Sequence, residues 1–186
     1  MAGKRFVFLD RDGTLVREVG YGHRLEDYEL LAGVPAALAR LSRAGFRLAI
    51  VTNQSGIGRG LFGWEDFERF HGRLLTDLRA AGVAIEHTYV CPHRPDEGCP
   101  CRKPRPGMLR RARDELGASL ATSWVVGDHA KDVELGANAG CRSILVLTGH
   151  GEREREAPGA ASAEAVLPDL AAAVEHIVAA ERSGDR

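Results

Sequence analysis

The sequence has neither the long apolar runs nor the basic excess that mark membrane and nucleic-acid-binding proteins, and its first residues are not expected to form a signal peptide. No apolar stretch approaches the ~20 residues that cross a bilayer. Only residues 6–9 are apolar between the charged N-terminus and Asp10, which is too short for a signal peptide. Lys and Arg number 25 against 26 Asp and Glu, so nothing favours nucleic acid as a partner. We therefore expect a cytoplasmic protein that binds neither membranes nor nucleic acid.

Cysteine is also scarce, with four in 186 residues. In the reducing cytoplasm these thiols are better candidates for metal ligands or packed side chains than for disulfides. Cys141 lies apart from the other three and is expected to be a packed thiol. The chain length and the 44% apolar composition fit one domain with a substantial core. We expect residues 1–186 to form a single domain that acts as a monomer.

Strand-like and helix-like segments alternate along the chain. Residues 6–14 predict a short buried strand that runs into a turn. This alternation is typical of an α/β protein with a doubly wound, mainly parallel sheet, whose ligands bind at the carboxyl ends of the strands. The glycine-rich connection 56–60 is expected to be a flexible turn. Further strands are expected at 47–51, 85–90, 124–126, 143–147 and 165–167, and helices at 35–44, 65–81, 107–116, 130–139 and about 168–181.

Two carboxylates, Asp10 and Asp12, stand where the first strand ends. Extended backbone places both on the same side of the chain, and Gly13 lets the chain turn. Carboxylates this close repel unless a cation lies between them or one keeps its proton. Mg²⁺ bound by Asp10 and a third carboxylate would leave Asp12 free to handle protons. A plain Asp-Gly turn is the alternative; a calcium loop fails because its fifth and twelfth positions are Thr14 and Tyr21.

Polar residues also follow two other expected strands. Thr52 and Asn53 come after the second strand, and Asp128 comes after the fourth. Because parallel strands present their carboxyl ends at one edge, these residues are expected to meet Asp10 and Asp12 there. The alternative, a plain Asp-Gly turn without chemistry, gives no reason for polar residues to follow three separate strands.

The loop 91–101 carries a second candidate metal site. Cys91, His93, Cys99 and Cys101 form the pattern C-x-H-x5-C-x-C. Three thiolates and one imidazole match a tetrahedral Zn²⁺ without an open position, which is the composition of a structural site. Such a site would order a loop too small to have its own core. Buried thiols at chance spacing are the alternative.

Four segments together resemble the haloacid dehalogenase (HAD) superfamily of phosphohydrolases. The segments are FLDRDGT, VTNQSGIGRG, CPHRPDEGCPCRKPRPGM and VVGDHAKD, and the similarity covers about residues 5–150. Within the superfamily the chain is most similar to the branch that contains D-glycero-D-manno-heptose-1,7-bisphosphate 7-phosphatase and the histidinol-phosphate phosphatase domain. The resemblance implies a Rossmann-like core, and the short connections leave no room for a separate cap domain.

The resemblance assigns roles to the carboxylates. Asp10 resembles the nucleophile that forms an aspartyl-phosphate, and Asp12 resembles the general acid and base. Asp10, the backbone carbonyl of Asp12 and the side chain of Asp128 match the Mg²⁺ ligands. Asp132 would not bind the ion itself but would help to hold its ligands in place.

The resemblance also implies how the phosphate is held. Thr52 and Asn53 would donate hydrogen bonds to phosphoryl oxygens, Lys103 would offset negative charge, and Arg102 would grip a substrate oxygen or a second phosphate. The full set of expected substrate-binding residues is Asp10, Arg11, Asp12, Glu18, Val19, Gly20, Tyr21, Thr52, Asn53, Gln54, Ser55, Arg102, Lys103 and His129.

The substrate is expected to be a small phosphorylated sugar. Gly20 and Tyr21, the segment TNQSGIGRG and the segment PRPGM resemble the heptose-bisphosphate branch more closely, and this resemblance favours the heptose bisphosphate over histidinol phosphate. Histidinol phosphate stays open as the alternative, because a family match indicates the chemistry better than the substrate. A phosphatase acting on nucleic-acid ends and a non-catalytic interaction module also stay open.

Overall fold

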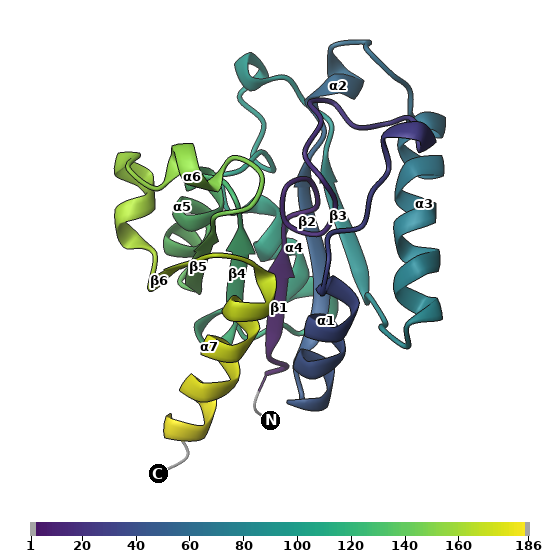
Figure 1. The fold of residues 1–186 in the computed structure, drawn as a ribbon. Helices are drawn as coiled ribbons and strands as arrows, with labels where there is room; N and C mark the ends of the chain where they lie inside the picture. The colour runs from purple at the N-terminus through teal and green to yellow at the C-terminus, as the bar shows by residue number, and fades with distance from the viewer. Residues whose placement is uncertain (1–2, 185–186) are drawn as a thin grey trace.

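The structure is a computed structural model that describes residues 3–184, and its centre is one parallel six-stranded sheet (Figure 1). The strand order is β3-β2-β1-β4-β5-β6, and every neighbouring pair is parallel. This confirms the predicted α/β fold class. The strands are β1 (Phe6–Leu9), β2 (Arg47–Asn53), β3 (His87–Cys91), β4 (Trp124–Gly127), β5 (Arg142–Val146) and β6 (Ala165–Leu167).

Helices cover both faces of the sheet. Val7 and Leu9 belong to the core shared with α1, α3 and α7, whereas Phe6 and Phe8 belong to the core shared with α4 and α5. This division follows from the alternation of side chains along a strand. The α-helices are α1 (Val34–Arg43), α2 (Ser55–Gly58), α3 (Trp64–Ala80), α4 (Gly107–Leu116), α5 (Ala130–Ala139), α6 (Gly151–Glu154) and α7 (Leu170–Gly184), and the 3₁₀-helices are η1 (Leu25–Asp27), η2 (Pro95–Glu97), η3 (Leu120–Thr122) and η4 (Pro158–Ser162).

The chain reverses its direction of travel across the sheet between β1 and β4. It moves from β1 outward to β2 and β3, and then returns to place β4 on the other side of β1. The backbone N–H of Asp10 donates to the carbonyl of Val126 at 3.0 Å, which ties the end of β1 to β4. Ligands of such sheets bind at this reversal, beyond the carboxyl ends of the strands.

The predicted elements are present, with differences at their ends. β2 continues to Asn53, so Thr52 and Asn53 lie within the strand and pair with β3. β3 begins at His87 rather than at residue 85. Between Gly3 and Gly184, none of the helices combines the length and the apolar character that crossing a bilayer requires.

The connection 56–60 differs from its prediction as a flexible turn, because Ser55–Gly58 form the short helix α2. A Cβ on Gly56 would lie 2.1 Å from the Phe62 ring, and one on Gly58 would lie 2.6 Å from the carbonyl oxygen of Pro92. These glycines therefore permit close packing of α2 rather than mobility. The short helix α6 was also not predicted.

Candidate active site

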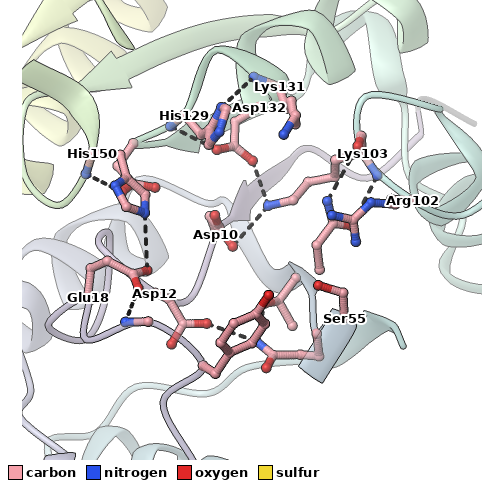
Figure 2. A pocket seen from close by; sticks show the side chains of 16 residues that line it. Asp10, Asp12, Glu18, Ser55, Arg102, Lys103, His129, Lys131, Asp132 and His150 are labelled. Carbon is pink, nitrogen blue, oxygen red and sulfur yellow. Dashed lines mark hydrogen bonds and ion pairs between the residues drawn. The ribbon is translucent and has the colours of Figure 1, made fainter. Parts of the chain in front are cut away.

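A pocket of about 350 Å³ opens beyond the carboxyl ends of β1, β2 and β4 (Figure 2). It gathers most of the residues predicted to bind substrate or Mg²⁺, from four separate segments of the chain. Lys131 and His150 also line it and were not predicted. The predicted residues in its lining are Asp10, Asp12, Glu18, Gly20, Tyr21, Thr52, Asn53, Gln54, Ser55, Arg102, Lys103, Asp128, His129 and Asp132.

Lys103 lies at the base of the pocket with all three of its ammonium donors engaged. Its Nζ is 2.9 Å from Oδ1 of Asp10, 2.6 Å from Oδ1 of Asp132 and 3.0 Å from the carbonyl oxygen of Val51. Burial alone would lower the pKa of Lys103, but the charges of Asp10 and Asp132 outweigh it and raise that pKa. The lysine is therefore a permanent cation beside Asp10.

Asp10, Asp128 and Asp132 each offer an oxygen atom, and these atoms lie within 4.8 Å of one another. Asp132 is already engaged, because its oxygens accept from Lys103 and from the backbone N–H of His129 at 3.1 Å. Burial, partly offset by Lys103, raises the pKa of Asp10 to about 7, and burial with the Asp10 charge raises the pKa of Asp128 to about 8. This pair of buried carboxyls fits a divalent cation such as Mg²⁺, which accepts oxygen ligands and relieves their repulsion.

Two glycines and a backbone donor set the position of Asp128. The backbone N–H of His150 donates to its Oδ2 at 2.7 Å. A Cβ on Gly13 would lie 2.0 Å from that oxygen and one on Gly149 would lie 2.1 Å from it, and both glycines have positive φ angles. Thr148 donates through Oγ1 to the carbonyl of Gly13 at 2.5 Å. The Asp128 carboxylate therefore depends on close backbone packing that only glycine allows.

Arg11 does not reach the pocket, which corrects its prediction as a substrate-binding residue. Its side chain is fully buried and lies against the rings of Phe67 and Phe70, with 5.3 and 4.8 Å between the guanidinium carbon and the ring centres. The guanidinium donates to both oxygens of Asp12, at 3.0 and 2.9 Å, and to the carbonyl of Gly22. Arg11 therefore orients the Asp12 carboxylate from behind.

The polar residues after β2 mainly hold other site residues in place. Gln54 donates from Nε2 to Oδ2 of Asp12 at 2.8 Å and to Oγ1 of Thr52 at 2.9 Å. Asn53 accepts from the backbone N–H of Lys103 at 3.1 Å through its Oδ1. Asn53 was predicted to contact the phosphoryl group. It lines the pocket, and that contact stays a prediction. Thr52 lies in the pocket wall as predicted.

The segment 18–21 forms the rim of the pocket, with one exception. Val19 is exposed and does not line the pocket, so the structure does not bring it to the site as predicted. Glu18 accepts from the backbone N–H of Gly20 at 2.5 Å, and its other oxygen lies 3.8 Å from Nε2 of His150. Because His150 follows β5, the rule that polar residues after strands form the site could have found it.

His129, which was predicted to bind substrate, lines the pocket and also has structural contacts. Its Nδ1 accepts from the backbone N–H of Lys131 at 3.3 Å, which caps α5, and it lies 2.9 Å from Oε2 of Glu154. The rings of His129 and His150 meet edge to face, with 6.1 Å between their centres. The two histidines form one wall of the pocket.

The predicted zinc ligands form a compact cluster. The sulfur of Cys99 is 3.6 Å from those of Cys91 and Cys101, and Nδ1 of His93 is 3.6 Å from the Cys91 sulfur and 3.3 Å from the Cys101 sulfur. A tetrahedral Zn²⁺ with sulfur at ~2.3 Å separates neighbouring ligands by roughly 3.8 Å, so the cluster has the composition and size of a structural zinc site. Arg105 also donates to the carbonyl of Cys99 at 2.7 Å.

Comparison with known proteins identifies the family. A D-glycero-beta-D-manno-heptose-1,7-bisphosphate 7-phosphatase of Pseudomonas putida is 39% identical over 94% of this chain and 99% of the relative. A D-glycero-D-manno-heptose-1,7-bisphosphate 7-phosphatase of Thermosynechococcus vestitus is 43% identical over 92% of this chain and 94% of the relative. The chain belongs to the heptose-bisphosphate phosphatase branch of the HAD family. The HAD-hydrolase-like family profile also matches residues 100–173.

Solved structures of the HAD family agree with this assignment. The D,D-heptose 1,7-bisphosphate phosphatase from B. bronchiseptica, complexed with magnesium and phosphate, matches with a TM-score of 0.88 and 34% identity over 95% of this chain and 99% of that one. The same enzyme from Burkholderia thailandensis matches with a TM-score of 0.73 and 32% identity over 94% of this chain and 99% of that one. The predictions of a HAD fold and of a phosphatase are confirmed.

Proposed function

We propose that this protein hydrolyses the 7-phosphate of D-glycero-D-manno-heptose 1,7-bisphosphate through an aspartyl-phosphate on Asp10. The observation that carries the proposal is the contact of Asp10 with the permanent cation Lys103, 2.9 Å away, beside the buried Asp128 carboxylate. This arrangement supplies a nucleophile, a charge that attracts phosphate and a place for a divalent cation. The names of the relatives supply the substrate.

Mg²⁺ would be held by the carboxylates of Asp10 and Asp128 and by the backbone carbonyl of Asp12. When bound it would neutralise charge on the phosphoryl oxygens. Asp132 contributes indirectly, because its hydrogen bond with Lys103 holds that ammonium group beside Asp10. This division of roles explains why three aspartates meet at one strand edge.

In the first step a carboxylate oxygen of Asp10 attacks phosphorus. A phosphorus–oxygen bond forms to Asp10, and the bond from phosphorus to the sugar oxygen breaks. Asp12 donates a proton to that leaving oxygen. Arg11 and Gln54 hold Asp12 in one orientation at the rim of the pocket.

In the second step water replaces the aspartyl group. Asp12, now ionised, accepts a proton from the water as its oxygen attacks phosphorus, and the bond from phosphorus to Asp10 breaks. Inorganic phosphate leaves and Asp10 is restored. Lys103 stays beside Asp10 through both steps and stabilises the charge on the transferring group.

The zinc loop acts as the support for Arg102 and Lys103. Cys101 directly precedes Arg102, whose guanidinium donates to the carbonyl of His93 at 3.2 Å. Zinc bound to Cys101 and His93 would therefore hold both ends of this contact. The loop places two cations at the pocket without a core of its own.

We also propose that the enzyme acts as a monomer in the cytoplasm. The groups that carry the proposed chemistry, Asp10, Lys103 and Asp128, all come from the same chain. A zinc site made of three thiolates is also compatible with a reducing compartment. Size-exclusion chromatography with light scattering tests the first point, and a single-chain mass supports it.

The direct test is kcat/KM, in Mg²⁺, for both anomers of the heptose bisphosphate and for histidinol phosphate. We expect at least one bisphosphate anomer to be hydrolysed with a kcat/KM about 100-fold or more above that of histidinol phosphate. A preference for histidinol phosphate would overturn the proposed substrate and leave the phosphatase chemistry intact. Loss of activity on every phosphate ester with Mg²⁺ present would overturn the chemistry.

A further inference from the structure

Three long basic side chains line the catalytic pocket: Arg102, Lys103 and Lys131. The whole chain has only three lysines, and two of them are here. Lys131 lies in the first turn of α5, next to His129, and carries no role in the proposed reaction. Its place in the pocket therefore needs a separate explanation.

The three cations differ in how many of their donors are free. Lys103 is saturated by two aspartates and a carbonyl. Arg102 gives one nitrogen to the carbonyl of His93, which leaves most of its guanidinium available. Lys131 makes no hydrogen bond or ion pair through its side chain to any residue within 3–184, although its charge is close enough to lower the pKa of His129. Arg102 and Lys131 are thus the pocket cations that still have unpaired hydrogen-bond donors.

The acidic side chains of the pocket repel a second anion. Asp12 and Glu18 lie on one side of Asp10, and in the view of Figure 2 Lys131 and Arg102 lie on the other side, flanking Lys103. A phosphate at Asp10 would occupy Lys103. A second phosphate on the same substrate would avoid the acidic side, and beyond Lys103 it would find the unpaired donors of Arg102 and Lys131.

We propose that Lys131 is a specificity-determining residue: it binds the second phosphate of a bisphosphate substrate in a subsite beside Arg102, which the family resemblance already assigns to a substrate oxygen or a second phosphate. The inference rests on the proposed function and concerns the substrate class of the same pocket. Lys131 acts on the end of the substrate that does not react. Its contribution therefore belongs to substrate selection and binding rather than to the chemical step.

The test compares Lys131→Met with the wild type on heptose 1,7-bisphosphate and on heptose 7-phosphate, which lacks the second phosphate. We expect kcat/KM for the bisphosphate to fall about tenfold or more, mainly through KM, because a charge-assisted contact is lost. We expect little change for the monophosphate or in inhibition by inorganic phosphate. Lys131→Arg should keep most of the preference. Lys4→Met is the matched control, because Lys4 is exposed and precedes β1 at the opposite end of the sheet.

The outcomes separate this inference from the proposed function. If Lys131→Met kept the wild-type ratio of the two kcat/KM values, or lost activity equally on both substrates, the subsite would be wrong and the phosphatase assignment would stand. If the wild type did not hydrolyse the bisphosphate, the proposed function would fail and the subsite with it. A selective loss on the bisphosphate, with Lys4→Met unchanged, supports the subsite.

Discussion

The carboxylate cluster and the cysteine-histidine cluster gather their ligands in different ways. Asp10 and Asp128 follow the first and fourth strands and meet only because β1 and β4 are neighbours in the sheet. The four zinc ligands lie within residues 91–101, where closure of a short loop brings them together. The carboxylate cluster thus depends on the fold, whereas the order of the zinc loop depends on its metal.

The two clusters are nevertheless coupled through Lys103. It lies two residues after Cys101 and reaches Asp10 and Asp132 with its ammonium group. A local, metal-ordered loop therefore supplies the cation of a site that the sheet assembles. Variants that alter one cluster at a time therefore test how strongly the activity and the structure of one cluster depend on the other.

The largest expected effect comes from Asp10→Asn, which removes the nucleophile from the carboxylate cluster. We expect turnover to fall by at least about 10⁴-fold, because an amide does not form the phosphoryl intermediate. The zinc content and the circular dichroism spectrum should stay unchanged, since the zinc loop does not depend on Asp10. Turnover within tenfold of the wild type would contradict the covalent route.

The second change, Cys99→Ser with zinc removed, breaks the local cluster instead. We expect kcat/KM to fall by about 100-fold, because Lys103 and Arg102 lose their fixed positions. Zinc content and kcat/KM measured on the same samples check this. Cys141→Ser is the matched control, because Cys141 lies outside the cluster. Full activity in a zinc-free Cys99→Ser protein would show that the loop does not support the site.

The third change, Asp132→Asn, acts on the link between the clusters. Asp132 accepts from Lys103 at 2.6 Å and from the backbone N–H of His129 at 3.1 Å. We expect kcat to fall about tenfold, since Lys103 loses one of its two carboxylate partners. Asp114→Asn, on the exposed face of α4, should leave kcat unchanged. An effect as large as that of Asp10→Asn would mean that Asp132 contacts the reacting group directly.

The smallest effect concerns the scaffold beneath the carboxylate cluster. Burial, followed by the charge of Arg11, lowers the pKa of the buried His71 to about 4 from its usual 6.5. The unfolded chain therefore binds a proton between pH 6.5 and 4 that the folded chain does not, so stability falls as the pH falls through this window. Removing the histidine should reduce that loss by up to roughly 3 kcal/mol.

Urea unfolding of wild type and His71→Gln at pH 7, 5.5 and 4.5 measures this difference. The free energy of unfolding of His71→Gln minus that of the wild type should increase as the pH falls. His87→Gln provides the control, because His87 is exposed at the start of β3. A gap that does not change with pH would mean that His71 is protonated in the folded state as readily as in the unfolded one.

The sequence alone predicted the features that depend on local pattern. Alternating apolar segments predicted the sheet and its helices, because a strand or helix buries one face according to its own periodicity. The carboxylates after β1, the hydroxyl and amide residues of β2 and Asp128 were predicted to meet, because parallel strands end at one edge. The zinc ligands were predicted from spacing, and they do converge.

Only the tertiary structure decided where individual side chains point. Arg11 and Val19 were predicted to bind substrate. The side chain of Arg11 is instead buried against α3, and Val19 is exposed outside the pocket. Lys131 and His150 line the pocket although neither was predicted as a site residue. The physical reason is that strand order and backbone periodicity depend on neighbouring residues, whereas the direction of a loop side chain depends on distant elements that share no pattern with it.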